Sequence, residues 1–196
     1  MPIPTLQLGS LAHIYAGVPT RSGRFPGRGV TRRILSVRAL NYSRLLPEAL
    51  IDAVPLSPEA ERYIARAGDV IIPARSTSFA AAIVPDELDG VVVNATLIGI
   101  RCGERIHPRL LAAYLRHPVG RAAIDELSQS GTAQMNVTVR ALANLRIPVP
   151  PRHTQERIAR MLEAADTAYD AAVHAAERRH SIANEIVLQA MTGATV

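Results

Sequence analysis

Residues 131–162, GTAQMNVTVRALANLRIPVPPRHTQERIARML, form the stretch that decides the fold. A loop of small and polar residues leads into VRALANL, a short helix that Thr138 can cap. Residues 146–149 read as a short apolar strand, which two prolines end. Thr154 is then placed to cap a long amphipathic helix. This order predicts the end of an α/β (α+β) domain followed directly by one long C-terminal helix.

A heptad-like pattern continues from residue 154 to about residue 189. Apolar and small residues recur at alternating steps of four and three, with Arg179 in the same row. They are Ile158, Leu162, Ala165, Tyr169, Ala172, Ala176, Ala183 and Ile186. Such a helix spans roughly 55 Å at a rise of about 1.5 Å per residue. One small domain cannot cover it, and the chain has no second heptad helix, so we expect the partner to be another copy or another subunit.

The composition excludes several classes of chemistry. All 22 basic residues are arginine, and the net charge is +5. Without lysine the chain lacks the phosphate-binding residue of a P-loop, the amine of a Schiff base and the lysine of a PD-(D/E)xK nuclease. Cys102 has no partner for a disulfide or a CxxC metal site, and the histidines follow no metal-binding spacing. We therefore expect a protein with no catalytic residues, no metal and no cofactor.

Other segments predict the remaining architecture. There is no apolar run of 18 residues and no signal-peptide pattern, so we expect a cytoplasmic protein without a membrane span. Strands are predicted at 34–40, 70–72, 80–84 and 91–100, and helices from Pro108 and over 119–128. Residues 6–17 predict a short helix or strand, and residues 41–58 an irregular segment.

Three groups of polar residues are candidates for DNA contact. A loop rich in Gly, Pro and Arg can neutralise phosphates, although it could also be a merely solvated basic loop; its candidates are Arg21, Arg24, Arg28 and Arg33. A polar connection between two strands suits groove contacts, or is an ordinary turn; it contains Arg75, Ser76, Thr77 and Ser78. Arg38 and Asn41 are readers or anchors, or structural ion-pair and turn residues.

Several blocks, in order along nearly the whole chain, resemble half of a type I restriction–modification DNA specificity subunit. The more specific ones are GDVIIPARS, GTAQMNVT and IPVPPRHTQERIARML. The resemblance implies a target recognition domain, residues 1–153, and a helical spacer for dimerisation, residues 154–196. Gln and Asn can pair with adenine, yet the family keeps the GTAQMNVT block similar in members that read different sequences. That fits a phosphate contact, a subunit contact or a fold-stabilising loop better than base readout. We favour positioning on the DNA backbone and therefore count these residues as DNA-binding candidates: Thr132, Gln134 and Asn136.

The resemblance also implies the function and the partners. Two copies are expected to pair through their helices, in antiparallel fashion, and to read an inverted repeat in double-stranded DNA with a fixed gap. The expected partners are a DNA adenine methyltransferase subunit, which uses S-adenosylmethionine, and an ATP-dependent restriction subunit. The alternative from another class is a non-catalytic adaptor or inhibitor built on the same fold. Salt-sensitive binding to a defined DNA motif distinguishes the first hypothesis from the second.

Overall fold

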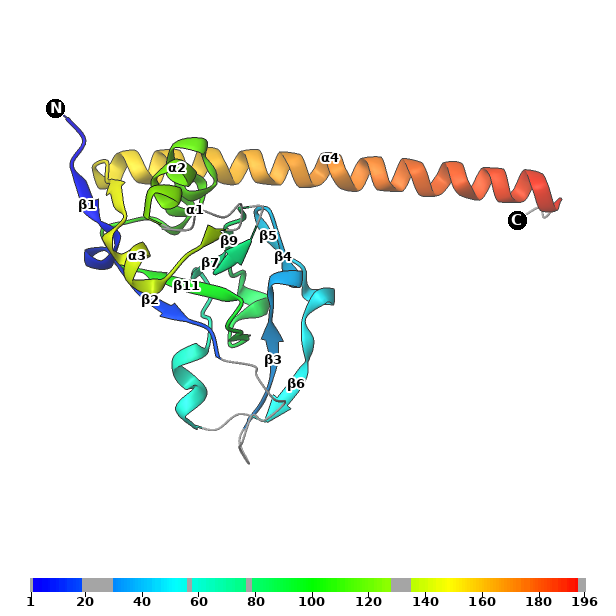
Figure 1. The fold of residues 1–196 in the computed structure, drawn as a ribbon. Coiled ribbons are helices and arrows are strands. Elements are labelled where there is room, and N and C mark those ends of the chain that lie inside the picture. The colour runs from blue at the N-terminus through cyan, green and yellow to red at the C-terminus, as the bar shows by residue number, and fades with distance from the viewer. Residues whose placement is uncertain (1, 19–29, 56–57, 77–78, 128–134, 194–196) are drawn as a thin grey trace. The chain divides into compact units, whose positions relative to one another are not determined.

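A computed structural model describes residues 2–18, 30–55, 58–76, 79–127 and 135–193 (Figure 1). The chain forms two compact units, residues 1–155 and 156–196. The first unit mixes short strands with the α-helices α1 (Pro108–Arg116), α2 (Pro118–Leu127) and α3 (Val139–Asn144). The second is most of one long helix, α4 (Arg152–Thr192). The expected fold class, an α/β domain followed by a long C-terminal helix, is confirmed.

A four-stranded antiparallel sheet forms the centre of the first unit. Its strand order is β2 (Ala12–Ala16), β11 (Leu97–Cys102), β7 (Val70–Pro73) and β9 (Ala82–Ile83). The predicted strands on either side of the polar connection pair with each other, with Val70 opposite Ile83. Successive residues of a strand point to opposite faces, so Val70 and Ile72 enter one hydrophobic core while Ile71 enters another.

Helices α1, α2 and α3 supply the other side of the first core. Leu111 and Leu115 of α1, Ile124 of α2 and Leu142 of α3 pack with the β7 and β11 side chains, and each is no more than 1% exposed. The predicted helices from Pro108 and over 119–128 are confirmed. Thr138 caps α3 as expected, because its Oγ1 accepts a hydrogen bond from Ala141 N at 3.1 Å.

The second core is bounded by a three-stranded sheet of β10 (Val92–Val93), β3 (Thr31–Leu35) and β6 (Ile51–Pro55). The prediction of one strand over 91–100 is wrong, because a turn separates β10 from β11 and the two strands join different sheets. Asn94 makes this turn: its Oδ1 accepts hydrogen bonds from Thr96 N at 2.7 Å and from Thr96 Oγ1 at 2.5 Å. A side-chain oxygen that bonds the backbone two residues later imitates a backbone turn and ends the strand.

The prediction of a strand over 34–40 is also wrong. Strand β3 ends at Leu35, and the 3-10 turn η2 (Val37–Ala39) follows, with Ala39 N donating to Ser36 O at 3.0 Å. The turn places both Leu35 and Ala39 in the second core at 0% exposure.

Regular structure also fills part of the segment that was expected to be irregular. Strands β4 (Leu40–Asn41) and β5 (Arg44–Leu45) form a hairpin, and the irregular prediction for 41–58 is wrong for β5 and β6. Two of its prolines stand at the first residues of the 3-10 turns η3 (Pro47–Ala49) and η4 (Pro58–Tyr63), where fixed φ is favourable.

The first and last strands of the domain pair with each other. The segment 6–17 contains β1 (Thr5–Gln7), the 3-10 turn η1 (Leu8–Ser10) and β2. Strand β1 lies antiparallel to β13 (Arg146–Pro148), whose position confirms the predicted last strand. Leu8 N donates to Leu145 O at 2.8 Å and Val149 N to Pro4 O at 2.8 Å, which extends the pairing at both ends.

Helix α4 begins two residues before the predicted cap, so the prediction that Thr154 caps it is wrong. The carbonyl of Pro151 accepts hydrogen bonds from Thr154 N at 2.9 Å and Gln155 N at 3.1 Å, which makes Thr154 part of the first turn. Among the described residues, no helix combines the length and apolar character needed to cross a membrane.

Candidate nucleic-acid interface

Two of the predicted DNA-binding residues meet on a short strand pair. Strand β8 (Arg75–Ser76) follows β7 after one residue and lies antiparallel to β12 (Met135–Asn136), with Arg75 opposite Asn136. Arg75 Nε donates a hydrogen bond to Asn136 Oδ1 at 3.3 Å. Side chains directly opposite each other in an antiparallel pair lie on one face. The fold therefore joins two residues that are 61 positions apart.

The position of this pair is fixed by its neighbours in the core. Val137, which follows Asn136, is 5% exposed and belongs to the first hydrophobic core. Its N–H donates to Ala74 O at 2.9 Å, which continues the β8–β12 pairing toward β7. The Arg75 side chain is exposed. With Nε bonded to Asn136, its two terminal nitrogens form an edge that matches two acceptors, as on a phosphate or on guanine O6 and N7.

The β4–β5 hairpin carries a third predicted residue, Asn41. Asn41 pairs across the hairpin with Arg44. Tyr42, the first of the two residues between them, accepts a hydrogen bond through its carbonyl from Ala81 N at 2.9 Å. Ala81 directly precedes β9, so the hairpin lies against the start of that strand, and Figure 1 shows β4 and β5 beside β9.

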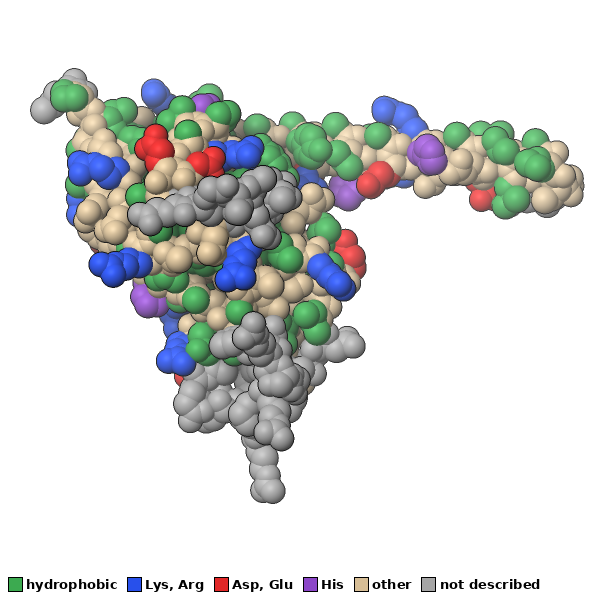
Figure 2. Space-filling model, in the orientation of Figure 1, with side chains coloured by type: hydrophobic (Ala, Val, Ile, Leu, Met, Phe, Trp, Pro, Cys, Tyr) green, Lys and Arg blue, Asp and Glu red, His purple; other side chains and the backbone are tan. Residues whose placement is uncertain are grey.

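The other predicted residues are distributed over different elements. Arg33 is exposed on β3, and Arg38 is exposed in η2. Ser76 has its backbone in β8, whereas its side chain is outside the description. The remaining candidates lie outside the described residues: Arg21, Arg24, Arg28, Thr77, Ser78, Thr132 and Gln134. Figure 2 shows arginine side chains at several separate places on one face of the first unit.

Two arginines have structural partners instead. Arg101 on β11 donates from Nε to Asp69 Oδ1 at 2.9 Å and from NH2 to Asp69 Oδ2 at 2.7 Å. Arg32 NH1 donates to the carbonyl of Gly90 at 3.1 Å. Both side chains tie segments of the domain together, and neither belongs to the candidate interface.

Asp69 is the centre of a buried polar cluster that sequence patterns did not indicate. Its side chain is 2% exposed and accepts, besides Arg101, the Tyr15 hydroxyl at 2.7 Å and Arg66 N at 3.0 Å. Burial, followed by the charge of Asp69, raises the pKa of the Tyr15 hydroxyl. The hydrogen bonds to Asp69 raise the pKa of the Arg101 guanidinium. The cluster connects β2, β11 and the residue before β7 through hydrogen bonds to one carboxylate, so we assign it a structural role in the central sheet.

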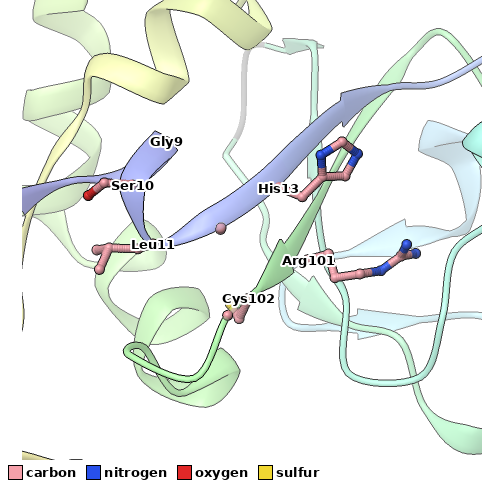
Figure 3. Close-up of a pocket in the computed structure, with 8 residues that line it drawn as sticks. Gly9, Ser10, Leu11, His13, Arg101 and Cys102 are labelled. Carbon is pink, nitrogen blue, oxygen red and sulfur yellow. The ribbon is translucent and has the colours of Figure 1, made fainter.

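A cavity of about 520 Å³ lies where β2 begins and β11 ends. Its lining includes His13, Arg101 and Cys102, and Figure 3 shows that the Arg101 side chain extends away from Cys102. Burial raises the pKa of the Cys102 thiol to about 12. The thiol therefore stays protonated near neutral pH and is a poor nucleophile. Among the described residues no three His, Cys, Asp or Glu side chains gather as metal ligands.

The Gln155 side chain connects the first turn of α4 to the loop before α1 through hydrogen bonds, a role that its position in that turn did not indicate. It is 2% exposed. Its Oε1 accepts from His107 N at 2.8 Å, and its Nε2 donates to the carbonyls of Arg105 at 3.0 Å and Pro150 at 2.9 Å. All its partners are backbone groups, which would otherwise lack these hydrogen bonds.

Most of the predicted helix-contact residues are exposed on α4. Ile158 and Leu162 are half-buried, and the exposed ones are Ala165, Tyr169, Ala172, Ala176, Ala183 and Ile186. Tyr169 and Ile186 are 64% and 59% exposed. Hydrophobic side chains are visible along α4 in Figure 2. An apolar row of this length, left exposed in a single chain, is typical of a helix that packs on another protein surface.

The chain matches a family profile and several solved structures. The profile is described as Type I restriction modification DNA specificity domain, and it matches residues 57–175. A structure reported for the complex assembly and conformational transition of the type I R-M system has 19% identity and a TM-score of 0.64; it covers 93% of this chain and 43% of that one. No curated protein sequence matches this chain.

Two further structures have the same fold. The HsdS subunit from Thermoanaerobacter tengcongensis has 23% identity and a TM-score of 0.56, over 88% of this chain and 39% of that one. The type I restriction–modification S subunit from M. genitalium has 12% identity and a TM-score of 0.63, over 96% of this chain and 46% of that one. The chain thus spans less than half the length of each of these three structures. At such low identity they show the fold alone, whereas the profile covers more than half of the 196 residues and shows the family. This chain belongs to the type I restriction modification DNA specificity domain family.

Proposed function

We propose that this chain is the DNA-recognition subunit of a type I restriction–modification system and that two copies pair through α4. The observation that carries the proposal is the extent of the family match. Residues 57–175 include Arg75, Asn136 and the first half of α4. The matched region therefore contains the Arg75–Asn136 pair and the start of the spacer helix, which supports the proposed division between reading and spacing.

Affinity and base choice come from different groups in this proposal. Arginines supply most of the affinity by neutralising phosphates, so binding weakens as salt concentration rises. Arg33 and Arg38, both exposed, are candidates for this role, together with Arg21, Arg24 and Arg28. Base choice comes from Arg75, whose terminal nitrogens can pair with guanine, while Asn136 holds its Nε.

Pairing of two copies supplies the second half of the DNA site. A two-fold axis between antiparallel α4 helices makes the two recognition units read an inverted repeat, and the helices set the gap. The exposed row that includes Tyr169 and Ile186 supports this pairing. The same helices are proposed to dock a DNA adenine methyltransferase subunit, which uses S-adenosylmethionine, and an ATP-dependent restriction subunit. This chain itself performs no catalysis and acts in the cytoplasm.

The first experiment is to isolate the chain from its host and to identify the proteins that accompany it by mass spectrometry. An adenine methyltransferase in the complex is expected, with a bipartite methylated motif in the host DNA. Isolation with an unrelated protein, and no motif enriched from a random duplex library, would contradict the proposal and favour the adaptor hypothesis.

A matched pair of α4 variants tests the pairing. Ile186→Asp places a charge in the exposed apolar row, and we expect it to convert dimers into monomers, measured by light scattering of the purified complex. Ser181→Asp adds the same charge five residues earlier, about 140° around the helix from the apolar row, and is expected to leave the dimer intact. Equal dimer content in both variants would rule out this row as the contact.

A further inference from the structure

Tyr42 has a backbone conformation that its own side chain disfavours. Its φ is +44°, and among the described residues it is the one non-glycine residue with a positive φ. It is the first residue of the two-residue loop that joins β4 and β5. Where positive φ is confined to the first residue of such a loop, glycine is favoured there. A bulky side chain in this region is strained, and such strain is concentrated at functional sites.

The backbone of Tyr42 makes a hydrogen bond within the domain, whereas its ring is not part of a hydrophobic core. The carbonyl of Tyr42 accepts the hydrogen bond from Ala81 N at 2.9 Å, a contact that glycine would make equally well. The side chain is 62% exposed. Burial of the ring therefore does not offset the strain.

The ring is nevertheless held in a defined place. The guanidinium carbon of Arg116, at the end of α1, lies 5.8 Å from the ring centroid. Arg116 NH1 also donates to the carbonyl of Ala81 at 2.6 Å. Arg116 and the Tyr42 backbone thus bind the same residue from two sides, which positions an exposed aromatic ring beside a cation.

The ring and the Arg75–Asn136 pair lie toward the same end of the central sheet. Strands β7 and β9 are antiparallel, with Ile71 opposite Ala82. The chain therefore leaves β7 toward Arg75 at the end where it enters β9 from Ala81. Asn41 and Arg44 flank Tyr42 in the hairpin. These polar and basic neighbours favour a nucleic acid over an apolar protein surface as the ligand.

We infer that Tyr42 is a DNA-contacting residue whose ring stacks on a deoxyribose of the duplex next to the base that Arg75 reads. The inference rests on the proposed function of the chain as a DNA-recognition subunit. Every nucleotide of DNA has the same deoxyribose, so this contact raises affinity with little sequence preference. Tyr42 contributes to the strength of binding, and Arg75 contributes to the choice of base.

Tyr42→Gly separates this role from a structural one. Glycine removes the ring and also relieves the positive-φ strain, so the variant is expected to resist denaturant at least as well as the wild-type chain. Its affinity for a duplex enriched by the wild-type complex from a random library is expected to fall about tenfold, because a contacting aromatic side chain is removed from the interface. Tyr42→Phe keeps the ring and is expected to bind like the wild type. Val119→Ala is the control, because it shortens another exposed apolar side chain of the same unit.

Two further measurements show how the ring acts. Stacking releases no counterions, so Tyr42→Gly is expected to keep the wild-type dependence of affinity on salt and the wild-type motif. Equal affinity of the glycine variant and the wild type would overturn the inference, as would a loss of methyltransferase binding with DNA affinity unchanged. A wild-type complex that enriches no motif would overturn the proposed function, and this inference with it.

Discussion

Asp69 connects three strands through one buried carboxylate. It directly precedes β7, while its partners Tyr15 and Arg101 come from β2 and β11. Removal of one partner from such a cluster leaves buried polar groups without hydrogen bonds, which costs about 1–3 kcal/mol for each neutral group and more for a charge. The contribution of the cluster to the free energy of unfolding therefore depends on the protonation states of Asp69, Tyr15 and Arg101.

The pH dependence of stability follows from the raised pKa of Tyr15. A group whose pKa is higher in the folded state adds stability that is fully present below its unfolded pKa, about 10, and is lost as the pH rises further. We expect the free energy of unfolding to decrease above pH 10, as measured by denaturant titration between pH 8 and 11. The decrease should be smaller in Tyr15→Phe. Equal decreases in the two proteins would contradict a role for Tyr15.

Asn94 decides, at the scale of secondary-structure elements, where one strand ends and another begins. It is 6% exposed, and its bonds to Thr96 turn the chain from the sheet of β10 into the sheet of β11. Asn94→Ala removes the acceptor for Thr96 N, and we expect a loss of about 1–3 kcal/mol in the free energy of unfolding. Asn94→Asp keeps an acceptor at this position and should lose less. Equilibrium unfolding curves of the wild type and the two variants measure these differences in the free energy of unfolding.

Elements with local signals could be predicted from the sequence, and elements that depend on distant contacts could not. Pro108 starts α1 and Thr138 caps α3 as predicted, because both signals act within one turn of helix. The VVVNATLIGI run is mostly apolar, and its pattern did not show that Asn94 divides it. Thr154 was predicted as the cap because threonine side chains often accept hydrogen bonds at the start of a helix. In the structure the backbone carbonyl of Pro151 accepts the hydrogen bonds from Thr154 N and Gln155 N.

The candidate interface shows the same limit. Arg75 and Asn136 were each predicted as DNA-binding residues, but their contact depends on pairing of β8 with β12 across 61 positions. Tyr42 was missed, because its positive φ and its contact with Arg116 exist only in the folded chain.

For the molecule as a whole, the length of α4 should determine the spacing between the two half-sites. A heptad inserted into α4 preserves the apolar row and lengthens the helix by about 10 Å at about 1.5 Å per residue. The methylated motif is expected to widen by about three base pairs, at about 3.4 Å per base pair. Sequencing of methylated DNA from cells that carry the variant measures the gap. The control replaces one heptad by another of the same length, and an unchanged gap in the insertion variant would refute this role of the helix.

The pairing of β1 with β13 places the two ends of the first unit side by side. Its entry and exit strands are neighbours, with Thr5 opposite Pro148 and Leu6 opposite Ile147. Neighbouring ends allow a domain to be transplanted, duplicated in tandem or circularly permuted without distortion of its interior. Under the proposed function, recombination between these two strands and the rest of the gene would exchange one recognition specificity for another and leave the following helix unchanged.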